Sequence, residues 1–338
     1  MRARCSLLVL ILLTTTCSDS RSLPAYDLSG NTMGTSFHIT LVAPPSDTDM
    51  DALRPAIHSK LEYVENIAST YRDTSELSLF NRNVSTDWIA TSPEFCQMMD
   101  ASIAVSTMTK GAFDMTVGPL VNLWGFGPTN MTNELPTDEE ILQIRSSVGY
   151  QQLAVDCDNS RIRKASANTF VDLSGWAKGH AVDEIAAILD ARNIENYIVE
   201  IGGELRLRGH NAEGERFSIA IEKPFEKSKV QFKAIRVTNL AVASSGDYRN
   251  FFLHDGHRYS HMINPGTGRP IDHALASVTV ISDTAAFADA MATALLVLGP
   301  EDGPALAEDL GVAAYFALNS ERGIKDQSTS EFDRLTQQ

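Results

Sequence analysis

Apolar side chains recur at helical spacing in several parts of the chain. Residues 53–68 present one apolar face, formed by Leu53, Ile57, Leu61, Val64 and Ala68. This spacing predicts an amphipathic helix, and residues 92–111 and 176–193 are predicted to be helical as well. The helix within 92–111 is expected to end at a C-cap on Gly111.

Short apolar runs between these helices predict strands. They are residues 35–43, 152–156, 161–165, 169–173, 196–209, 216–223, 234–246, 277–282 and 312–318. Because the strands outnumber the helices and are mostly joined by hairpin-like turns, the pattern favours an α+β fold over a regular alternating parallel sheet. No internal repeat or break in composition divides the chain, so one large domain is expected.

Two further helices are predicted, and one of them raises a chemical question. Thr137 and Glu140 form a capping box, which predicts a helix start. Residues 286–299, "AFADAMATALLVLG", form an apolar helix that carries Asp289 and Thr293 four residues apart, on one face. The threonine can bond back to its own helix, and the aspartate can interact with the helix dipole. Alternatively, the pair offers oxygen ligands to a hard cation such as Mg²⁺.

The first residues have the pattern of an export signal. Arg2 and Arg4 precede an apolar run that is too short to span a membrane, and small residues then lead to Cys17. A cysteine in this place predicts a lipoprotein that is cleaved before Cys17 and acylated on it. Cleavage nearby, which would give a soluble secreted protein, is the alternative.

Charge and cysteine content narrow the function classes. The net charge is -15 and no dense run of Lys and Arg occurs, which argues against a nucleic-acid partner. An anionic substrate would therefore need local basic groups or a metal ion. Cys96 and Cys157 remain once the N-terminal segment is set aside, and their spacing does not decide whether they pair. No CxxC motif supports a zinc or redox-dithiol site.

Four segments carry more glycine and polar residues than a core requires, namely 110–127, 171–184, 199–207 and 244–271. Glycine allows a backbone to approach a ligand closely, and aromatic side chains in the first segment can stack on a flat ring. In the second segment a strand-turn-helix pattern precedes Lys178, which adds positive charge near a helix start. The fourth holds His261, which is a candidate for a structural or a catalytic role.

The chain resembles the ApbE family of FAD:protein FMN transferases. The motifs that carry this resemblance occur in order from about Asn31 to the end of the 286–299 helix. They are "NTMGT", "YRDTSELSLFN", "GAFDMTVGPLVNLWG", "DLSGWAKGHAVD", "EIGGELRLRG", "SSGDYRNFF", "RYSHMINPGTGRP" and "ADAMATALLVLG".

This resemblance implies a mixed α/β, T-fold-like architecture and a Mg²⁺-dependent enzyme. The expected reaction splits FAD, attaches FMN to a Thr or Ser hydroxyl of a target flavoprotein and releases AMP. Targets in the family include subunits of the sodium-pumping NADH:quinone reductase and related complexes. The family also implies a lipid-anchored protein on the periplasmic side of the bacterial inner membrane.

The resemblance assigns roles to individual residues. Asp289, Thr293 and the backbone carbonyl of Gly175 match the Mg²⁺ ligands. Either Asp289 or His261 is expected to be, or to orient, the base that deprotonates the acceptor hydroxyl. The residues expected to bind FAD are Met33, Tyr71, Ala112, Phe113, Asp114, Asp172, Lys178 and Ile263.

The implied domain organisation covers the whole chain. Residues 1–16 are expected to be a signal peptide, 17–29 a lipidated cysteine and tether, 30–325 the transferase domain and 326–338 a C-terminal tail. Two rival functions use the same site. One is an FAD pyrophosphatase that gives FMN and AMP, and the other is a non-catalytic flavin-binding lipoprotein.

Overall fold

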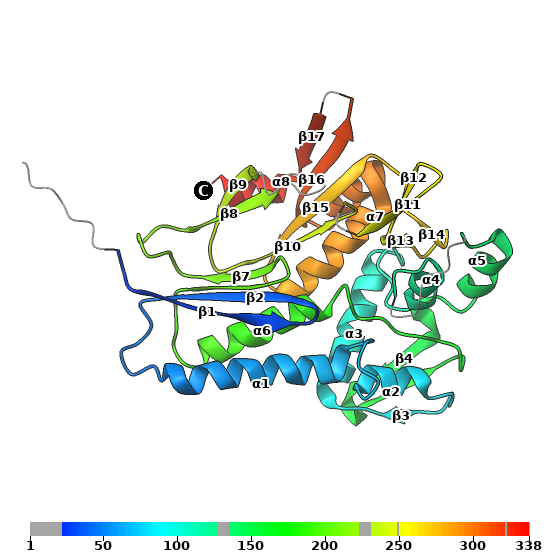
Figure 1. Ribbon diagram of the computed structural model, residues 1–338, viewed down its shortest axis with the longest axis horizontal. Coiled ribbons are helices and arrows are strands. Elements are labelled where there is room, and N and C mark those ends of the chain that lie inside the picture. Colours follow the sequence, from blue (N-terminus) through cyan, green and yellow to red (C-terminus); the bar gives the residue numbers. More distant parts are fainter. Residues whose placement is uncertain (1–21, 128–134, 223–230, 249, 322, 338) are drawn as a thin grey trace, which may run out of the picture.

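The computed structural model describes residues 22–127, 135–222, 231–248, 250–321 and 323–337 (Figure 1). Its centre is an eight-stranded sheet in which every pair of neighbours is antiparallel. The order across the sheet is β1 (Ala25–Thr32), β2 (Thr35–Val42), β6 (Tyr197–Ile201), β7 (Glu204–Arg208), β10 (Ala241–Gly246), β15 (Leu275–Ser282), β16 (Ala313–Ser320) and β17 (Gly323–Ser328). The expected α+β class is confirmed.

Helices cover one face of this sheet. They are α1 (Met50–Ala68), α6 (Ala177–Asp190) and α7 (Ala285–Asp309), which bends at Gly299. Figure 1 shows α1 and α6 below β1 and β2. Alternate residues of the strands, such as Ile39 and Val199, pack against α1 and α6 in one buried cluster. The period of two along the strands thus places one apolar face toward the helices.

The opposite face of the sheet has a smaller cover. A hairpin of β8 (Phe217–Glu222) and β9 (Gln231–Val237) lies there with α8 (Ser330–Thr336). Phe332 of α8 is fully buried in the apolar cluster of this face, beside Tyr315 of β16.

A second group of elements packs beside α7. It contains α2 (Glu76–Arg82), α3 (Pro93–Met108), α4 (Gly118–Leu123), α5 (Asp138–Arg145), the small sheet of β3 (Ile89–Ala90), β5 (Arg161–Lys164) and β4 (Leu153–Asp156), and the hairpins β11 (Phe251–His254) with β12 (His257–Ser260) and β13 (Ile263–Asn264) with β14 (Arg269–Pro270). A disulfide joins Cys96 of α3 to Cys157, which follows β4. The pairing that the spacing left undecided is therefore made.

Several local predictions are confirmed and two are wrong. The capping box of Thr137 and Glu140 is present with both of its hydrogen bonds. Helix α3 ends at Met108 with Thr109 as its C-cap, so Gly111 is not the cap but follows it with φ of 84°. Residues 169–173 form no strand, because their backbone bonds to loops: the Asp172 amide donates to the Met115 carbonyl.

Both ends of the predicted domain need correction. Strand β1 begins at Ala25, so the last five residues of the proposed tether over 17–29 belong to the sheet. The proposed tail over 326–338 includes the end of β17 and all of α8. The signal peptide and Cys17 lie outside the described residues. Within the described part of the chain, no helix has both the length and the hydropathy needed to cross a bilayer.

Candidate functional site

A cavity of about 420 Å³ opens where α6, α7 and the loops around α4 meet the sheet. Eleven of the residues predicted for the site line it. They are Tyr71, Ala112, Phe113, Asp114, Asp172, Gly175, Lys178, His261, Ile263, Asp289 and Thr293. Because these residues come from five separate segments, the fold itself assembles the cavity.

The floor of the cavity carries the predicted metal ligands. Asp289 and Thr293 lie one turn apart near the start of α7, and Asp289 is only 4% exposed. The Thr293 hydroxyl lies 3.1 Å from the hydroxyl of Ser245 on β10. Gly175 adjoins them, since a Cβ added there would lie 3.6 Å from Thr293 Oγ1. A carboxylate, a hydroxyl and a nearby backbone carbonyl form a donor set that suits a hard cation such as Mg²⁺.

Lys178 lies between two carboxylates on this floor. Its Nζ donates to Glu204 Oε1 at 3.0 Å and lies 3.5 Å from Asp289 Oδ2. Glu204 is 4% exposed, and its second oxygen is buried without a hydrogen-bond partner in the described structure. Two buried carboxylates that share one ammonium leave an excess of negative charge, which a bound cation would balance.

The pKa values on this floor reflect that charge balance. Burial raises the pKa of Asp289, while Lys178 and the Gly179 amide oppose the rise. Burial also raises the pKa of Glu204, to about 7, again against the effect of Lys178. Burial alone would lower the pKa of Lys178, but the charges of Asp289 and Glu204 raise it. Lys178 therefore stays charged at neutral pH.

His261 faces the cavity from the segment after β12. Its Nδ1 lies 2.9 Å from the Asn250 carbonyl oxygen. Since a carbonyl can only accept, Nδ1 carries the hydrogen in this arrangement and Nε2 is left as an acceptor. Burial lowers the pKa of His261, so the ring is neutral at neutral pH. A neutral imidazole with a free Nε2 can accept a proton.

Asp114 shapes the wall of the cavity through internal hydrogen bonds. Its Oδ1 accepts from the amide and hydroxyl of Thr116, and its Oδ2 accepts from the amide of Tyr150. Asp172 similarly accepts from the amide of Ser174. Asp114 thus holds the loop that presents Ala112 and Phe113, and both of its oxygens are already engaged.

Tyr71 and Met33 occupy different positions relative to the cavity. Tyr71 lies at its mouth and is 72% exposed. Met33 lies outside the cavity lining, at the turn between β1 and β2, and borders a smaller hollow that is also lined by Glu65. Its φ of 49° places the backbone in the left-handed region. The structure therefore does not bring Met33 to the cavity with the other predicted residues.

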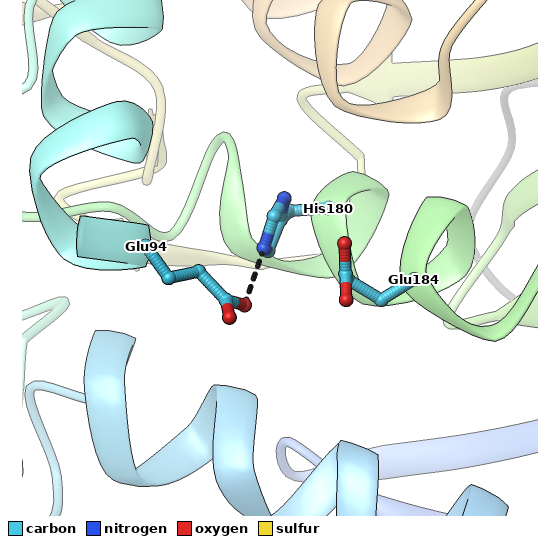
Figure 2. Close-up of side chains that lie close together, drawn as sticks. All are labelled: Glu94, His180 and Glu184. Carbon is cyan, nitrogen blue, oxygen red and sulfur yellow. Dashed lines mark hydrogen bonds and ion pairs between the residues drawn. The ribbon is translucent and has the colours of Figure 1, made fainter. Parts of the chain in front are cut away.

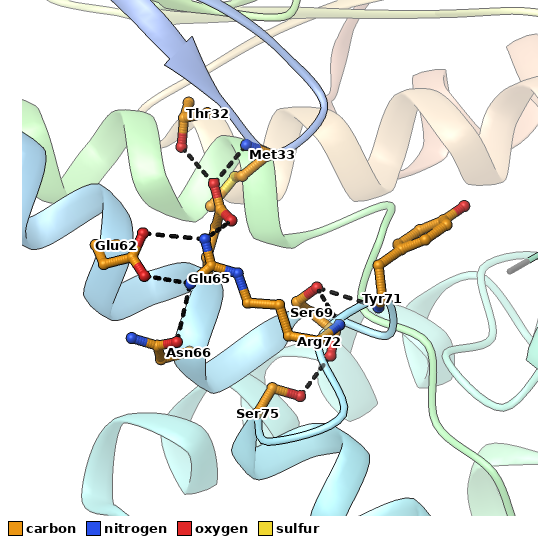
Figure 3. Close-up of polar contacts among 9 residues, drawn as sticks. All are labelled: Thr32, Met33, Glu62, Glu65, Asn66, Ser69, Tyr71, Arg72 and Ser75. Atoms are coloured by element: carbon orange, nitrogen blue, oxygen red, sulfur yellow. Dashed lines mark hydrogen bonds and ion pairs between the residues drawn. The ribbon is translucent and has the colours of Figure 1, made fainter.

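A polar network nevertheless connects the Met33 turn to the Tyr71 loop (Figure 3). Glu65 Oε1 accepts hydrogen bonds from the Met33 amide at 2.6 Å and from the Thr32 hydroxyl at 2.8 Å. Arg72, which follows Tyr71, pairs with Glu65 through that carboxylate's other oxygen. The two segments are consequently held at a fixed separation.

Glu204 and Ser245 also line the cavity, although neither is predicted from the sequence. Glu204 lies at the start of β7, directly after the tight turn of Gly202 and Gly203, whose φ values are 63° and 108°. An acidic residue that faces inward at a strand start is the signal that could have identified it. Ser245 lies in a segment of polar residues on β10 and gave no comparable signal.

Comparisons with known proteins identify the family of this chain. The model of the ApbE family matches residues 33–316. An FAD:protein FMN transferase of Vibrio cholerae is 43% identical, over 90% of this chain and 91% of its own. A protein of the same name from Haemophilus influenzae is 40% identical, over 92% of this chain and 91% of its own.

Solved structures give the same result for the fold. The flavin transferase ApbE from Vibrio cholerae superposes with a TM-score of 0.86 at 41% identity, covering 93% of this chain and 99% of that one. The flavinyl transferase ApbE of Pseudomonas stutzeri, in its apo form, superposes with a TM-score of 0.85 at 36% identity, covering 93% and 98%. The likeness thus extends over nearly all of both chains.

Proposed function

The chain belongs to the ApbE family, and we propose that it is a transferase that moves FMN from FAD to a Thr or Ser hydroxyl of another protein. AMP is the second product. The observation that carries this proposal is the single cavity that unites Asp289, Thr293 and Gly175 with Lys178 and His261.

The floor of the cavity is the proposed place of the FAD pyrophosphate. Asp289, Thr293 and the Gly175 carbonyl would hold Mg²⁺, which when bound neutralises negative charge on the phosphates. Lys178 adds a positive charge that Glu204 keeps in position. These groups orient the pyrophosphate so that the FMN phosphorus faces the incoming hydroxyl.

His261 is the proposed base. The acceptor oxygen forms a bond to the FMN phosphorus, the bond from that phosphorus to the AMP oxygen breaks, and AMP leaves with the electron pair. The hydroxyl proton passes to Nε2 of His261. We favour His261 over Asp289 because the Asp289 carboxylate already faces Lys178 and would be neutralised further by a metal ion.

The flavin ring is assigned to the mouth of the cavity. Tyr71 offers an exposed aromatic face there, while Ala112, Phe113 and Ile263 give apolar contacts deeper in. Asp172 is assigned to a polar part of FAD, and Asp114 supports the wall. Met33 lies outside the cavity lining, so it is left out of the proposed flavin contacts.

The proposed location is the periplasmic side of the inner membrane, with Cys17 as the lipid-modified residue. The disulfide between Cys96 and Cys157 supports an exported protein, because disulfides persist in oxidising compartments. The acceptor proposed from the family resemblance is a flavoprotein such as a subunit of a sodium-pumping NADH:quinone reductase.

One experiment separates this function from its two rivals. The protein is incubated with FAD, Mg²⁺ and a candidate acceptor domain, and the products are examined on a denaturing gel under ultraviolet light and by chromatography for AMP. A fluorescent acceptor band with AMP supports the transferase. AMP without a fluorescent band indicates an FAD pyrophosphatase, and the absence of both products indicates a flavin-binding protein.

A further inference from the structure

Three side chains outside the cavity converge between α3 and α6 (Figure 2). His180 and Glu184 are four residues apart on α6 and therefore share one face. Glu94 reaches them from the first turn of α3, with its Oε1 3.0 Å from His180 Nε2. The ligand atoms of all three residues lie within 4.8 Å of one another, and the three side chains are partly buried.

These donors differ from those on the cavity floor. One imidazole and two carboxylates suit a first-row transition metal or zinc, whereas Mg²⁺ prefers oxygen ligands alone. Zinc bonds of about 2.0–2.2 Å put neighbouring ligand atoms somewhat more than 3 Å apart. Closing the present spacing would require rotations of the long Glu94 and Glu184 side chains, while His180 is already in contact with Glu94.

The local charge favours a cation. Lys60 of α1 forms an ion pair with Glu184 Oε2 at 2.7 Å, so the described structure places one ammonium beside this cluster. Two carboxylates thus face one ammonium, which leaves negative charge uncompensated. Lys60 also binds one Glu184 oxygen and leaves the other for a further ligand, so the ammonium competes with a metal ion without closing the site.

We propose that Glu94, His180 and Glu184 bind one divalent transition-metal cation, for which Zn²⁺ is the probe. The ion would link the start of α3 to α6, two residues beyond Lys178. Its role would be to fix the helix that carries Lys178, and it would take no part in the chemistry. Binding would stabilise the folded chain according to the ligand concentration.

The test uses the full chain carrying Asp289→Asn, which removes the carboxylate of the cavity floor as a competing Zn²⁺ ligand. We expect calorimetric titration with Zn²⁺ to give one saturable site that excess Mg²⁺ does not occupy. Co²⁺ in place of Zn²⁺ should give visible absorption bands of a protein-bound ion. His180→Ala and Glu184→Gln, each added to Asp289→Asn, should weaken binding by about tenfold or more, on the scale of losing one contact around a metal.

Two further variants make the result decisive. His38→Ala, at an exposed histidine of β2, is the matched control and should leave Zn²⁺ affinity unchanged. Lys60→Met removes the competing ammonium and should strengthen Zn²⁺ binding and increase the rise in melting temperature on adding Zn²⁺. The proposal is overturned if no saturable site is found, if binding survives both His180→Ala and Glu184→Gln, or if Lys60→Met lowers stability without any gain in Zn²⁺ affinity.

Discussion

Two clusters described above pair a lysine with carboxylates, and they differ in the exposed fraction of the carboxylate side chains. In the cavity, the Glu204 and Asp289 side chains around Lys178 are each 5% exposed. Between the helices, the Glu184 side chain beside Lys60 is 29% exposed. The lysines themselves are similarly accessible, at 29% and 27%. The carboxylates, rather than the lysines, therefore distinguish the two places.

This difference has an energetic consequence. Removing one partner from a buried ion pair leaves an uncompensated charge and is strongly destabilising, whereas an exposed pair contributes at most about 1 kcal/mol. The pKa values of Asp289 and Glu204 are raised by burial, so each of these carboxylates is ionised at a cost. Such a cost is tolerated where a cation is expected to bind, so mutations in the cavity should lower the activity per folded molecule as well as the stability.

The largest effect is expected for Asp289→Asn. A neutral amide oxygen holds Mg²⁺ far less well than a carboxylate, so transferase activity should fall by about 100-fold or more, on the scale of losing one charge-stabilising group. Thr293→Val keeps the shape and should give a milder loss that added Mg²⁺ partly restores. Initial rates against Mg²⁺ concentration, with melting curves for both proteins, check this.

The opposite outcome would remove the metal site from the cavity. If Asp289 and Thr293 serve only the packing of α7, both variants should melt at lower temperature. Their activity per folded molecule and their Mg²⁺ dependence should then match those of the unmodified protein.

Glu204→Gln should give the next largest effect, and it tests the balance of charge between Lys178 and its two carboxylates. Without the Glu204 charge, the Lys178 ammonium turns to Asp289 and competes with the metal, so about tenfold more Mg²⁺ should be needed for half-maximal rate. Since the pKa of Glu204 is about 7, protonation below that pH should raise the Mg²⁺ requirement of the unmodified protein as well. Rates over a grid of pH and Mg²⁺ concentration measure both effects.

In the Glu204→Gln protein this part of the pH dependence should disappear, because the amide does not titrate. A Mg²⁺ requirement that still rises below pH 7 in the variant would show that another group is responsible.

Tyr71→Ala should have a smaller effect, confined to binding. Stacking on the flavin contributes mainly to ground-state affinity, so KM for FAD should rise by about tenfold with kcat little changed. Steady-state kinetics with varied FAD distinguishes the two parameters. A fall in kcat at unchanged KM would contradict the assignment of Tyr71 to the flavin ring.

The sequence predicted the interior of the fold better than its edges. The strand at 35–43 and the helix at 53–68 were found because one face of each is buried, which produces a regular apolar pattern. Strand β1 lies at the edge of the sheet, and most of its side chains are exposed. Its sequence therefore lacks an apolar face and is interpreted as part of a polar tether. Helix α8 is held by a single fully buried anchor, Phe332, which gives no periodic signal.

The site shows a similar limit. Asp289 and Thr293 could be paired from their spacing on one helix, and the family resemblance supplied most of the other residues. Neither source placed Glu204 beside Lys178, because that contact joins β7 to α6 across 26 positions in sequence. Met33 belongs to one of the family motifs but lies outside the cavity. The sequence could not show this, because the position of the Met33 turn depends on its hydrogen bond to Glu65 of α1.

The smallest effect is expected for Lys60→Met in the absence of added metal. The pair with Glu184 is partly exposed on both sides, so its removal should change the free energy of unfolding by less than about 1 kcal/mol. Burial opposes the charged form of Lys60, but Glu184 and Glu94 still raise its pKa, so the pair is intact at neutral pH. Urea unfolding in the presence of a chelator measures the change, with Lys60→Arg as the control that keeps the charge. A decrease of several kcal/mol in the free energy of unfolding would mean that this cluster is as strongly coupled as the one around Lys178. The contrast between the two clusters would then no longer hold.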